Sequence, residues 1–193
     1  MLIKTGYIAE SGSELTLKGV IANKISDCNP ILLTELIMGD HLDDLDIDEI
    51  AAILSIFLDT KVEGSDNNKQ PTNIESVKIT NSVKSVIKTL YPIIDMYLDF
   101  EEVNELYLGV DWTTHLAMME VSYKWAQGIP LKDVGCQTFE GNFVRDMIKL
   151  TSICQTVGRV AELINKIDLV EKMKELEKKV MRDIVSIDSL YIL

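Results

Sequence analysis

The stretch FEGNFVRDMIKLTSICQTVGRVAELI, residues 139–164, predicts a long helix with two different faces. Apolar residues recur in it at spacings of three and four, which is the rhythm of one face of an α-helix. The apolar seam consists of Phe143, Met147, Leu150, Cys154, Val157, Ala161 and Ile164, and it is flanked by Ile148, Ile153, Val160 and Leu163. Because the apolar part is so wide, we expect the helix to be packed on most of its circumference inside a helical bundle.

A polar stripe follows the same rhythm on the opposite side of this helix. It consists of Arg145, Lys149, Ser152, Thr156 and Arg159. At about 100° per residue, the stripe and the seam point roughly half a turn apart. A solvated face is the ordinary explanation for such a stripe. Three cations on a mostly buried helix are nevertheless unexpected in a chain of net charge −12, so the stripe is the first candidate for a functional surface.

Composition limits what the chain can bind. It has 193 residues, of which 47% are hydrophobic, enough to bury one core. It carries 31 acidic and 19 basic residues, and an acidic domain repels the phosphates that dominate nucleic-acid affinity. Any nucleic-acid contact should therefore be local, short and assisted by another domain.

The cysteines and the hydropathy pattern favour a cytoplasmic or nuclear protein. Cys28, Cys136 and Cys154 show no spacing pattern, which is typical of reduced thiols. Residues 1–10 do not have the pattern of a signal peptide. No apolar run approaches the roughly 20 residues needed to span a bilayer, so we expect no contact with a membrane.

The rest of the chain predicts an all-α bundle of seven or eight helices, with a short extended, wing-like element at the N-terminus. Residues 2–17 read as two short strands around a turn. Residues 61–73 contain almost no apolar side chains, which predicts a flexible surface loop. A helix is expected from about 74 to 105, kinked or split at Pro92. Asp111 is expected to cap the next helix.

Nothing in the sequence predicts catalytic machinery. A phosphate-binding loop of the GxxxxGK[ST] kind is absent, and serine, cysteine and histidine form no recognisable nucleophile arrangement. His41 lies near Asp40, Asp43 and Asp44. That cluster could bind a cation, but an acidic helix end or turn is the simpler account. We therefore expect no catalytic, cofactor-binding or metal-binding residue in this chain.

Four segments, in this order and spacing, resemble a known family. They are residues 32–37 (LLTELI) with 43–45 (DDL) and 51–55 (AAILS); 124–128 (KWAQG); 140–145 (EGNFVR); and 182–193 (RDIVSIDSLYIL). Together they are similar to the C-terminal helical (DSHCT, ratchet) domain of superkiller-type, exosome-associated superfamily 2 RNA helicases. The resemblance covers almost the whole chain apart from residues 61–73.

The resemblance implies a role for the two-faced helix. In that family the domain follows two ATP-binding RecA-like domains and a winged-helix domain, and its ratchet helix lines a channel for single-stranded RNA. The match places that helix on residues 140–164 and its RNA-facing positions on Lys149 and Ser152, within the same polar stripe as Arg145, Thr156 and Arg159. Relatives often have an arginine at the position of Lys149 and an acidic residue at the position of Ser152. Lys149 keeps the charge without the planar fork, and Ser152 lacks the carboxylate.

The resemblance also implies a division of the chain and of its chemistry. Residues 1–18 would be the end of a winged-helix element, and residues 19–193 the ratchet-type domain. ATP and magnesium would belong to the absent upstream domains of a parent ATP-dependent RNA helicase. The partners would be single-stranded RNA, those upstream domains and an RNA-degradation complex. A composition rich in Ile, Asp and Asn suggests an AT-rich genome, viral or protist.

Other interpretations remain open from the residues alone. Arg145 could pair with an acidic side chain and serve only to fix the packing of its helix. The whole chain could be an acidic helical adaptor for protein–protein interaction, without nucleic-acid contact. An enzyme with a new kind of site is the least favoured alternative, because Trp112, Met119 and Trp125 are typical core residues.

Overall fold

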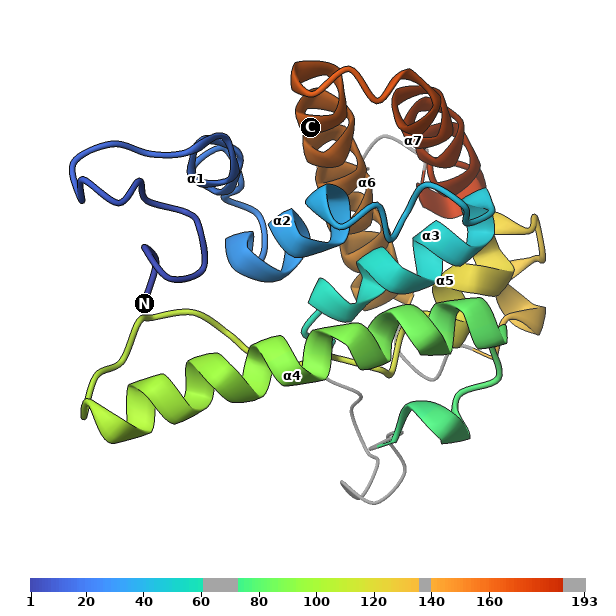
Figure 1. Cartoon of the computed structure of the whole chain (residues 1–193). Helices are drawn as coiled ribbons and strands as arrows, with labels where there is room; N and C mark the ends of the chain where they lie inside the picture. The colour runs from blue at the N-terminus through green and yellow to red at the C-terminus, as the bar shows by residue number, and fades with distance from the viewer. Residues whose placement is uncertain (61–72, 136–139, 186–193) are drawn as a thin grey trace, which may run out of the picture.

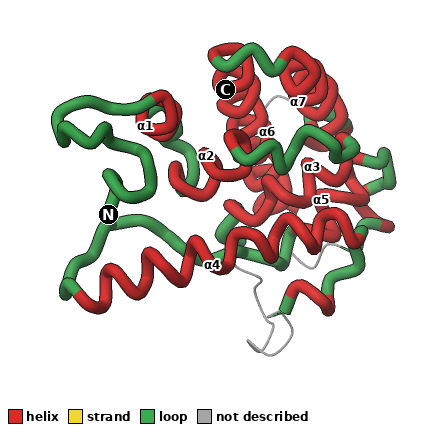
Figure 2. Tube along the Cα trace, viewed as in Figure 1, coloured by secondary structure: helices red, strands yellow, loops and turns green. Residues whose placement is uncertain are grey.

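Helices make up most of the chain that the structure describes (Figures 1 and 2). The computed structural model describes residues 1–60, 73–135 and 140–185. Its α-helices are α1 (Leu17–Ala22), α2 (Pro30–Met38), α3 (Ile47–Leu54), α4 (Asn81–Val103), α5 (Met119–Ala126), α6 (Glu140–Leu163) and α7 (Ile167–Val180). Single 3-10 turns are η1 (Ser55–Phe57), η3 (Ile74–Ser76), η4 (Leu131–Asp133) and η5 (Asp183–Val185). The predicted all-α class is confirmed. The loop predicted at 61–73, apart from Asn73, and residues 186–193 of the last motif lie outside the described residues.

Helices α6 and α7 form a hairpin that packs on α3 (Figure 1). The link between them turns at Asn165, whose φ of 59° lies in the left-handed region that asparagine tolerates. α3 also packs broadly on α5, and α5 in turn contacts α7. The core of the bundle therefore lies among these four helices, with α4 running along one side of α3.

The apolar seam of α6 is buried as predicted. Phe143, Met147, Leu150, Cys154, Val157 and Ala161 are completely buried, and Ile164 beyond the helix end is half-buried. The flanking residues divide: Ile153 and Val160 are buried, whereas Ile148 and Leu163 are exposed. The buried face is therefore narrower than the sequence suggested, and α6 has more open surface than the polar stripe alone.

Trp125 in α5 joins three parts of the chain. Its ring meets the Phe143 ring of α6 edge-on, with centroids 5.0 Å apart and planes at 82°. Its indole N–H donates a hydrogen bond of 2.9 Å to the Val180 carbonyl at the end of α7. The Arg182 guanidinium lies 3.4 Å above the ring and donates to the carbonyls of Trp125 and Ile129. Three of the four segments that carry the family resemblance thus meet at one indole.

Helix α4 differs from the prediction in its start and at Pro92. It begins at Asn81 because Thr80 caps it: the Thr80 hydroxyl accepts the Val83 N–H and donates to Glu49. The helix continues through Pro92 to Val103, so the predicted split is wrong. Pro92 is exposed, and water can therefore satisfy the carbonyl that proline leaves without an intrahelical partner.

The helix predicted to start at Asp111 is also absent over residues 111–118. Asp111 accepts the Thr113 N–H at 2.9 Å and pairs with the His115 ring at 3.0 Å, so its carboxylate stabilises a local turn instead of a helix start. The backbone N–H of His115 donates to the Ile56 carbonyl at 3.0 Å. α5 begins only at Met119, after the residues that make these contacts.

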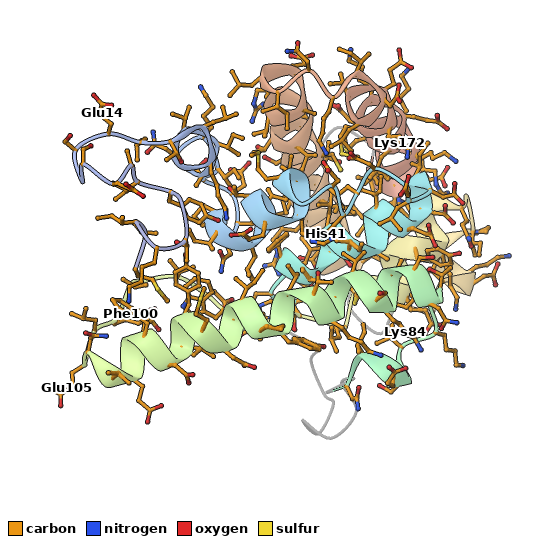
Figure 3. The ribbon with its side chains drawn as sticks, viewed as in Figure 1. Glu14, His41, Lys84, Phe100, Glu105 and Lys172 are labelled. Carbon is orange, nitrogen blue, oxygen red and sulfur yellow. The ribbon has the colours of Figure 1, made fainter. Side chains whose placement is uncertain are left out.

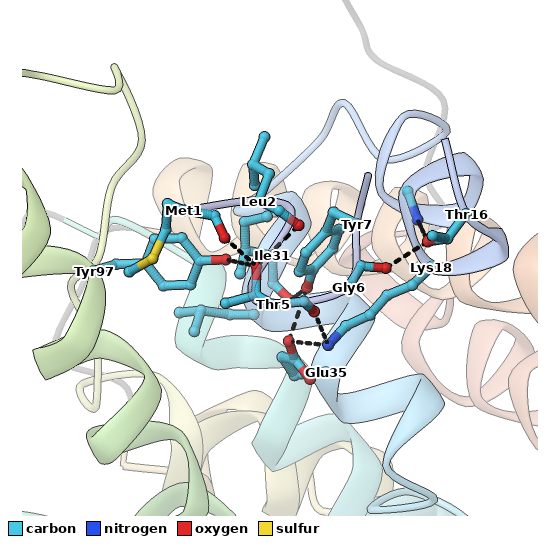
Figure 4. Close-up of polar contacts among 12 residues, drawn as sticks. Met1, Leu2, Thr5, Gly6, Tyr7, Thr16, Lys18, Ile31, Glu35 and Tyr97 are labelled. Atoms are coloured by element: carbon cyan, nitrogen blue, oxygen red, sulfur yellow. Dashed lines mark hydrogen bonds and ion pairs between the residues drawn. The ribbon is translucent and has the colours of Figure 1, made fainter. Parts of the chain in front are cut away.

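The N-terminal segment lies against α2 and α4 through polar contacts (Figure 4). The Tyr7 hydroxyl donates to Glu35 at 2.9 Å, and Lys18 pairs with the same carboxylate at 2.7 Å. Thr5 shares a 3.0 Å hydrogen bond with the Tyr97 hydroxyl of α4. Within the described residues, the two predicted strands are reduced to one antiparallel bridge between Ile8 and Leu15.

Two isoleucines of α6 offer a test of how this helix is buried. Ile153 is completely buried, whereas Ile148 is 51% exposed. Ile153→Ala should lower the free energy of unfolding by about 2–5 kcal/mol because it leaves a cavity in the core. The same substitution at Ile148 should cost about 0.5 kcal/mol or less. Urea denaturation of both variants measures the difference, and equal losses would contradict the orientation of α6.

Candidate functional site

The five residues of the polar stripe lie on α6 but differ in their access to solvent. Arg145 and Arg159 are exposed, and the Arg145 side chain is 65% accessible. Lys149 and Ser152 are half-buried, whereas Thr156 is buried. The stripe is therefore a shallow polar surface with an exposed cation near each end.

A carboxylate from another part of the chain lies across the middle of this stripe. Asp27, in the link between α1 and α2, accepts hydrogen bonds from the hydroxyls of Ser152 at 2.8 Å and Thr156 at 3.1 Å. Arg159 donates to the Thr156 hydroxyl at 2.8 Å. The sequence suggested a stripe whose only charges are cations, but the structure adds the carboxylate of Asp27. Asp27 is 125 residues from Ser152, and no local signal in the sequence indicated that the two meet.

Asn29 holds the link that carries Asp27. Its side-chain oxygen caps α2 by accepting the N–H groups of Ile31 and Leu32, each at 3.0 Å. Its amide group donates to the Asp111 carbonyl at 2.8 Å. Pro30 follows at the first position of the helix, where its missing N–H costs nothing. The position of Asp27, two residues earlier, is therefore fixed by the start of α2.

The surroundings of Asp27 keep it ionised. Its pKa is lowered chiefly by the hydrogen bond from Ser152, and burial offsets part of this effect. The hydrogen bonds from Thr156 and Ser26 and the charge of Arg159 lower the pKa further. A carboxylate that accepts several hydrogen bonds is stabilised in its charged form. At neutral pH the middle of the stripe therefore carries a negative charge.

Lys149 lines a cavity of about 250 Å³ beside the stripe. Asp27, Asp59, Asp111 and His115 line the same cavity, yet Lys149 forms no ion pair with any residue that the structure describes. Its charge acts on Asp146, whose pKa is raised by burial, while the hydrogen bond from Thr60 and the charges of Arg145 and Lys149 lower it.

Two cysteines near this surface, Cys28 and Cys154, have raised thiol pKa values. Cys28 also lines the cavity, and burial raises the pKa of its thiol to about 12. Burial likewise raises the pKa of Cys154 to about 12. Both thiols are therefore neutral at physiological pH, whereas the thiolate is the reactive form.

Arg145 makes only a weak contact with a carboxylate. Its Nε lies 3.8 Å from Asp146, which is buried and accepts a hydrogen bond of 2.7 Å from Thr60. Burial raises the pKa of Asp146. The ion pair considered from the sequence is thus present but long, and most of the guanidinium remains open to solvent.

The acidic cluster near His41 contains its own cation. Lys166, in the link after α6, pairs with both Asp40 and Asp43, and Lys172 donates to the Asp43 carbonyl at 2.6 Å. His41 and Lys172 are labelled in Figure 3. The described residues contain no group of three histidine, cysteine or acidic side chains that could hold a metal ion.

None of the described helices has the length and apolar character needed to cross a membrane.

In class, the chain is an all-α domain in which one long helix, α6, carries a buried apolar seam and a partly exposed polar stripe. The model of the DSHCT (NUC185) domain matches residues 12–188, so the chain belongs to the DSHCT domain family. This confirms the resemblance to superkiller-type RNA helicases.

The relatives of the chain are much longer proteins. It is 26% identical to the antiviral helicase SKI2 of Saccharomyces cerevisiae over 99% of its own length and 15% of that protein. It is 27% identical to the human exosome RNA helicase MTR4, over 100% and 18%, and 30% identical to the mouse superkiller complex protein 2, over 96% and 14%. The chain therefore spans less than a fifth of each. None of these three is viral, so they do not support the viral source suggested by composition.

The contact between Asp27 and the stripe makes a prediction about pH. Ser152→Ala should raise the pKa of Asp27 toward its ordinary value of about 3.9, because it removes the largest stabilising hydrogen bond. Since the folded-state pKa is lowered, the stability that Asp27 contributes is present above the unfolded-state pKa and is lost as the pH falls through the folded one. The variant should lose part of this acid-sensitive stability and keep the part due to Thr156, Ser26 and Arg159.

Carboxyl-carbon NMR of Asp27 during an acid titration measures the shift. Gln155→Ala is the matched control, because Gln155 lies on α6 but is exposed and bonds to Glu177 instead. An unchanged Asp27 titration in Ser152→Ala would show that the hydrogen bond does not form in solution.

Proposed function

We propose that this chain is the C-terminal domain of an ATP-dependent RNA helicase and that it contacts single-stranded RNA through α6. The observation that carries the proposal is the polar stripe of α6, in which Arg145 and Arg159 are exposed and Lys149 is half-buried. Membership of a domain family whose relatives include named RNA helicases supports it. In this proposal Lys149 and Ser152 face the strand, with Arg145, Thr156 and Arg159 completing the surface.

The spacing of the cations suits an extended strand. Arg159 lies fourteen positions after Arg145, which is about 21 Å along a helix. A strand lying along α6 would meet Arg145 first, Lys149 one turn later and Arg159 toward the far end. Arginine and lysine bind phosphates without regard to sequence. Contacts of this kind would let the strand be held at several points, each of them weak.

The chemistry of ATP is assigned to other domains of the parent protein. The sequence has no phosphate-cradling glycine loop, and the described residues offer no set of ligands for a metal ion. ATP and magnesium would be bound upstream, in RecA-like domains, and α6 would guide the strand that those domains move. In this division, residues 1–18 end a winged-helix element and residues 19–193 form the ratchet-type domain.

The names of the relatives also suggest where the parent protein acts. One relative is an exosome RNA helicase and another is a superkiller complex protein. We propose an RNA-degradation complex as the setting and the cytoplasm or nucleus as its location. The domain itself would serve as a guide for RNA and not as an enzyme.

An apolar surface at the end of α4 favours a second function, that of an acidic adaptor for proteins. Val103 and Tyr107 are each 82% exposed. Leu98, Leu106 and Leu108 beside them are also exposed, and the last turn of α4 contains no basic residue. Figure 3 shows Phe100 and Glu105 at this end of the helix. Exposed apolar side chains with acidic neighbours suit a partner with an apolar groove and a basic rim.

The RNA proposal predicts a specific effect of the stripe cations. Lys149→Ala should weaken the binding of single-stranded RNA and reduce the slope of log affinity against log salt by about 0.7, the value for one lost phosphate contact. Arg145→Ala and Arg159→Ala should act in the same direction. Fluorescence anisotropy of a labelled oligonucleotide at several salt concentrations measures both quantities.

Lys178→Ala is the control, because Lys178 is an exposed lysine on α7 outside the stripe. If all four variants bind RNA as the unchanged chain does, the stripe is not an RNA surface. The adaptor function would replace the RNA function under a different result. In that result the chain binds no RNA but binds a basic, leucine-containing peptide, and Tyr107→Ser abolishes the peptide binding.

A further inference from the structure

Asp27 divides the stripe into regions of opposite charge. Lys149 lies on one side of the Ser152 and Thr156 hydroxyls and Arg159 on the other, whereas the carboxylate of Asp27 is bound directly to both hydroxyls. A phosphate placed at these hydroxyls would be within contact distance of a carboxylate that is ionised at neutral pH. Like charges at such a distance repel. The middle of the stripe is therefore a poor site for the RNA backbone.

The same carboxylate is a good acceptor for a nucleobase. Only one of its oxygens is used by Ser152 and Thr156, while the other accepts a weaker bond of 3.3 Å from Ser26. Since a carboxylate offers about four acceptor sites, capacity remains for a donor from a ligand. Cytosine carries an amino group at N4, and aspartate accepts hydrogen bonds from it. Uracil presents a carbonyl oxygen at that position, which a carboxylate repels.

The adjoining cavity has room for a single base. Asp27 and Lys149 both line it, and Phe57, Val110 and Pro30 supply apolar surface. Its volume of about 250 Å³ lies below the range of roughly 300–1,000 Å³ that is typical of pockets for drug-sized ligands. Proteins that recognise single-stranded RNA commonly splay bases out and bind them by their polar edges. Lys149 could donate to a ring nitrogen or carbonyl oxygen while Asp27 accepts from the amino group.

We propose that Asp27 determines which part of the RNA meets the middle of α6: it confines phosphates to the flanking cations and selects a base with an amino group, cytosine over uracil. The inference rests on the proposed function, because it assumes that α6 contacts RNA. It adds base selectivity, which contacts between the cations and phosphates do not provide. Asp27 would act by touching the base itself, and not only by holding Ser152 and Thr156 in place.

The test compares cytidine and uridine decamers of RNA bound to the 193-residue chain at physiological salt, where the repulsion by the acidic surface is screened. The RNA is titrated up to about 1 mM, above the Kd of about 10⁻⁴–10⁻⁶ M that is typical of non-specific nucleic-acid binding. The unchanged chain should prefer the cytidine decamer by about 3- to 10-fold, the equivalent of one hydrogen bond. In Asp27→Asn this ratio should fall to about 1, because the side chain gains a donor that suits uracil as well. The affinity for both decamers should rise, since one negative charge is removed.

Asp59→Asn is the matched control. Asp59 lines the same cavity and carries the same charge, but among the described residues it has no hydrogen bond to the stripe. This variant should raise the affinity for both decamers and keep the preference for cytidine. Asparagine at position 27 retains an oxygen that can accept from Ser152, and circular dichroism would verify that both variants fold.

The outcomes separate this inference from the function on which it rests. If the unchanged chain binds both decamers equally, or if Asp27→Asn keeps the preference, the role of Asp27 is overturned. In that case the proposed function stands as long as Lys149→Ala still lowers the affinity. If neither decamer binds, or if Lys149→Ala binds like the unchanged chain, the proposed function fails and the inference fails with it.

Discussion

The burial of Trp125 fixes the position of α6, and the candidate site depends on that position. The indole packs edge-on against Phe143 and donates its single N–H to the end of α7, while Arg182 covers its outer face. A buried indole N–H without an acceptor costs free energy, so the hydrogen bond from Trp125 to Val180 favours this placement of the ring over alternatives that would lose it. Since Phe143 lies in the first turn of α6 and Val180 ends α7, one side chain aligns both helices of the hairpin.

A fixed α6 determines which way its polar stripe faces. The seam from Phe143 to Ala161 is completely buried, so a rotation of the helix would expose apolar surface and bury arginine. Ser152 and Thr156 must therefore face the link between α1 and α2, where Asn29 holds Asp27. The surface that results has cations at its ends and a carboxylate at its centre. The packing that fixes the orientation of α6 thus also determines the order of charges that a ligand would meet.

The parts of this structure that could be predicted from sequence are those that local pattern controls. The seam of α6 follows from spacing alone, whereas the burial of the flanking residues does not: Ile153 is buried and Ile148 is exposed, because burial depends on which other parts of the chain cover each position. Pro92 was expected to kink or split α4; the helix is not split, and because the proline is exposed, water can satisfy the carbonyl that it leaves without an intrahelical partner. Asp111 looked like a helix cap, but its carboxylate is engaged by Thr113 and His115. Asp27 could not have been found from pattern, since its contact with Ser152 joins residues 125 positions apart.

The charge of the whole chain explains why its cations would act only at short range. With 31 acidic and 19 basic residues, the surface repels RNA at a distance. At physiological salt this repulsion is screened beyond about 8 Å, so Lys149 and the two arginines can act once a strand is already in place. On the proposed function, other domains would deliver that strand. A guide surface that attracted RNA strongly would also hold it, whereas a few cations around a repelling carboxylate would let the strand advance. The acidity of the chain and the function of its stripe are therefore compatible, because weak local contacts suit a strand that must keep moving.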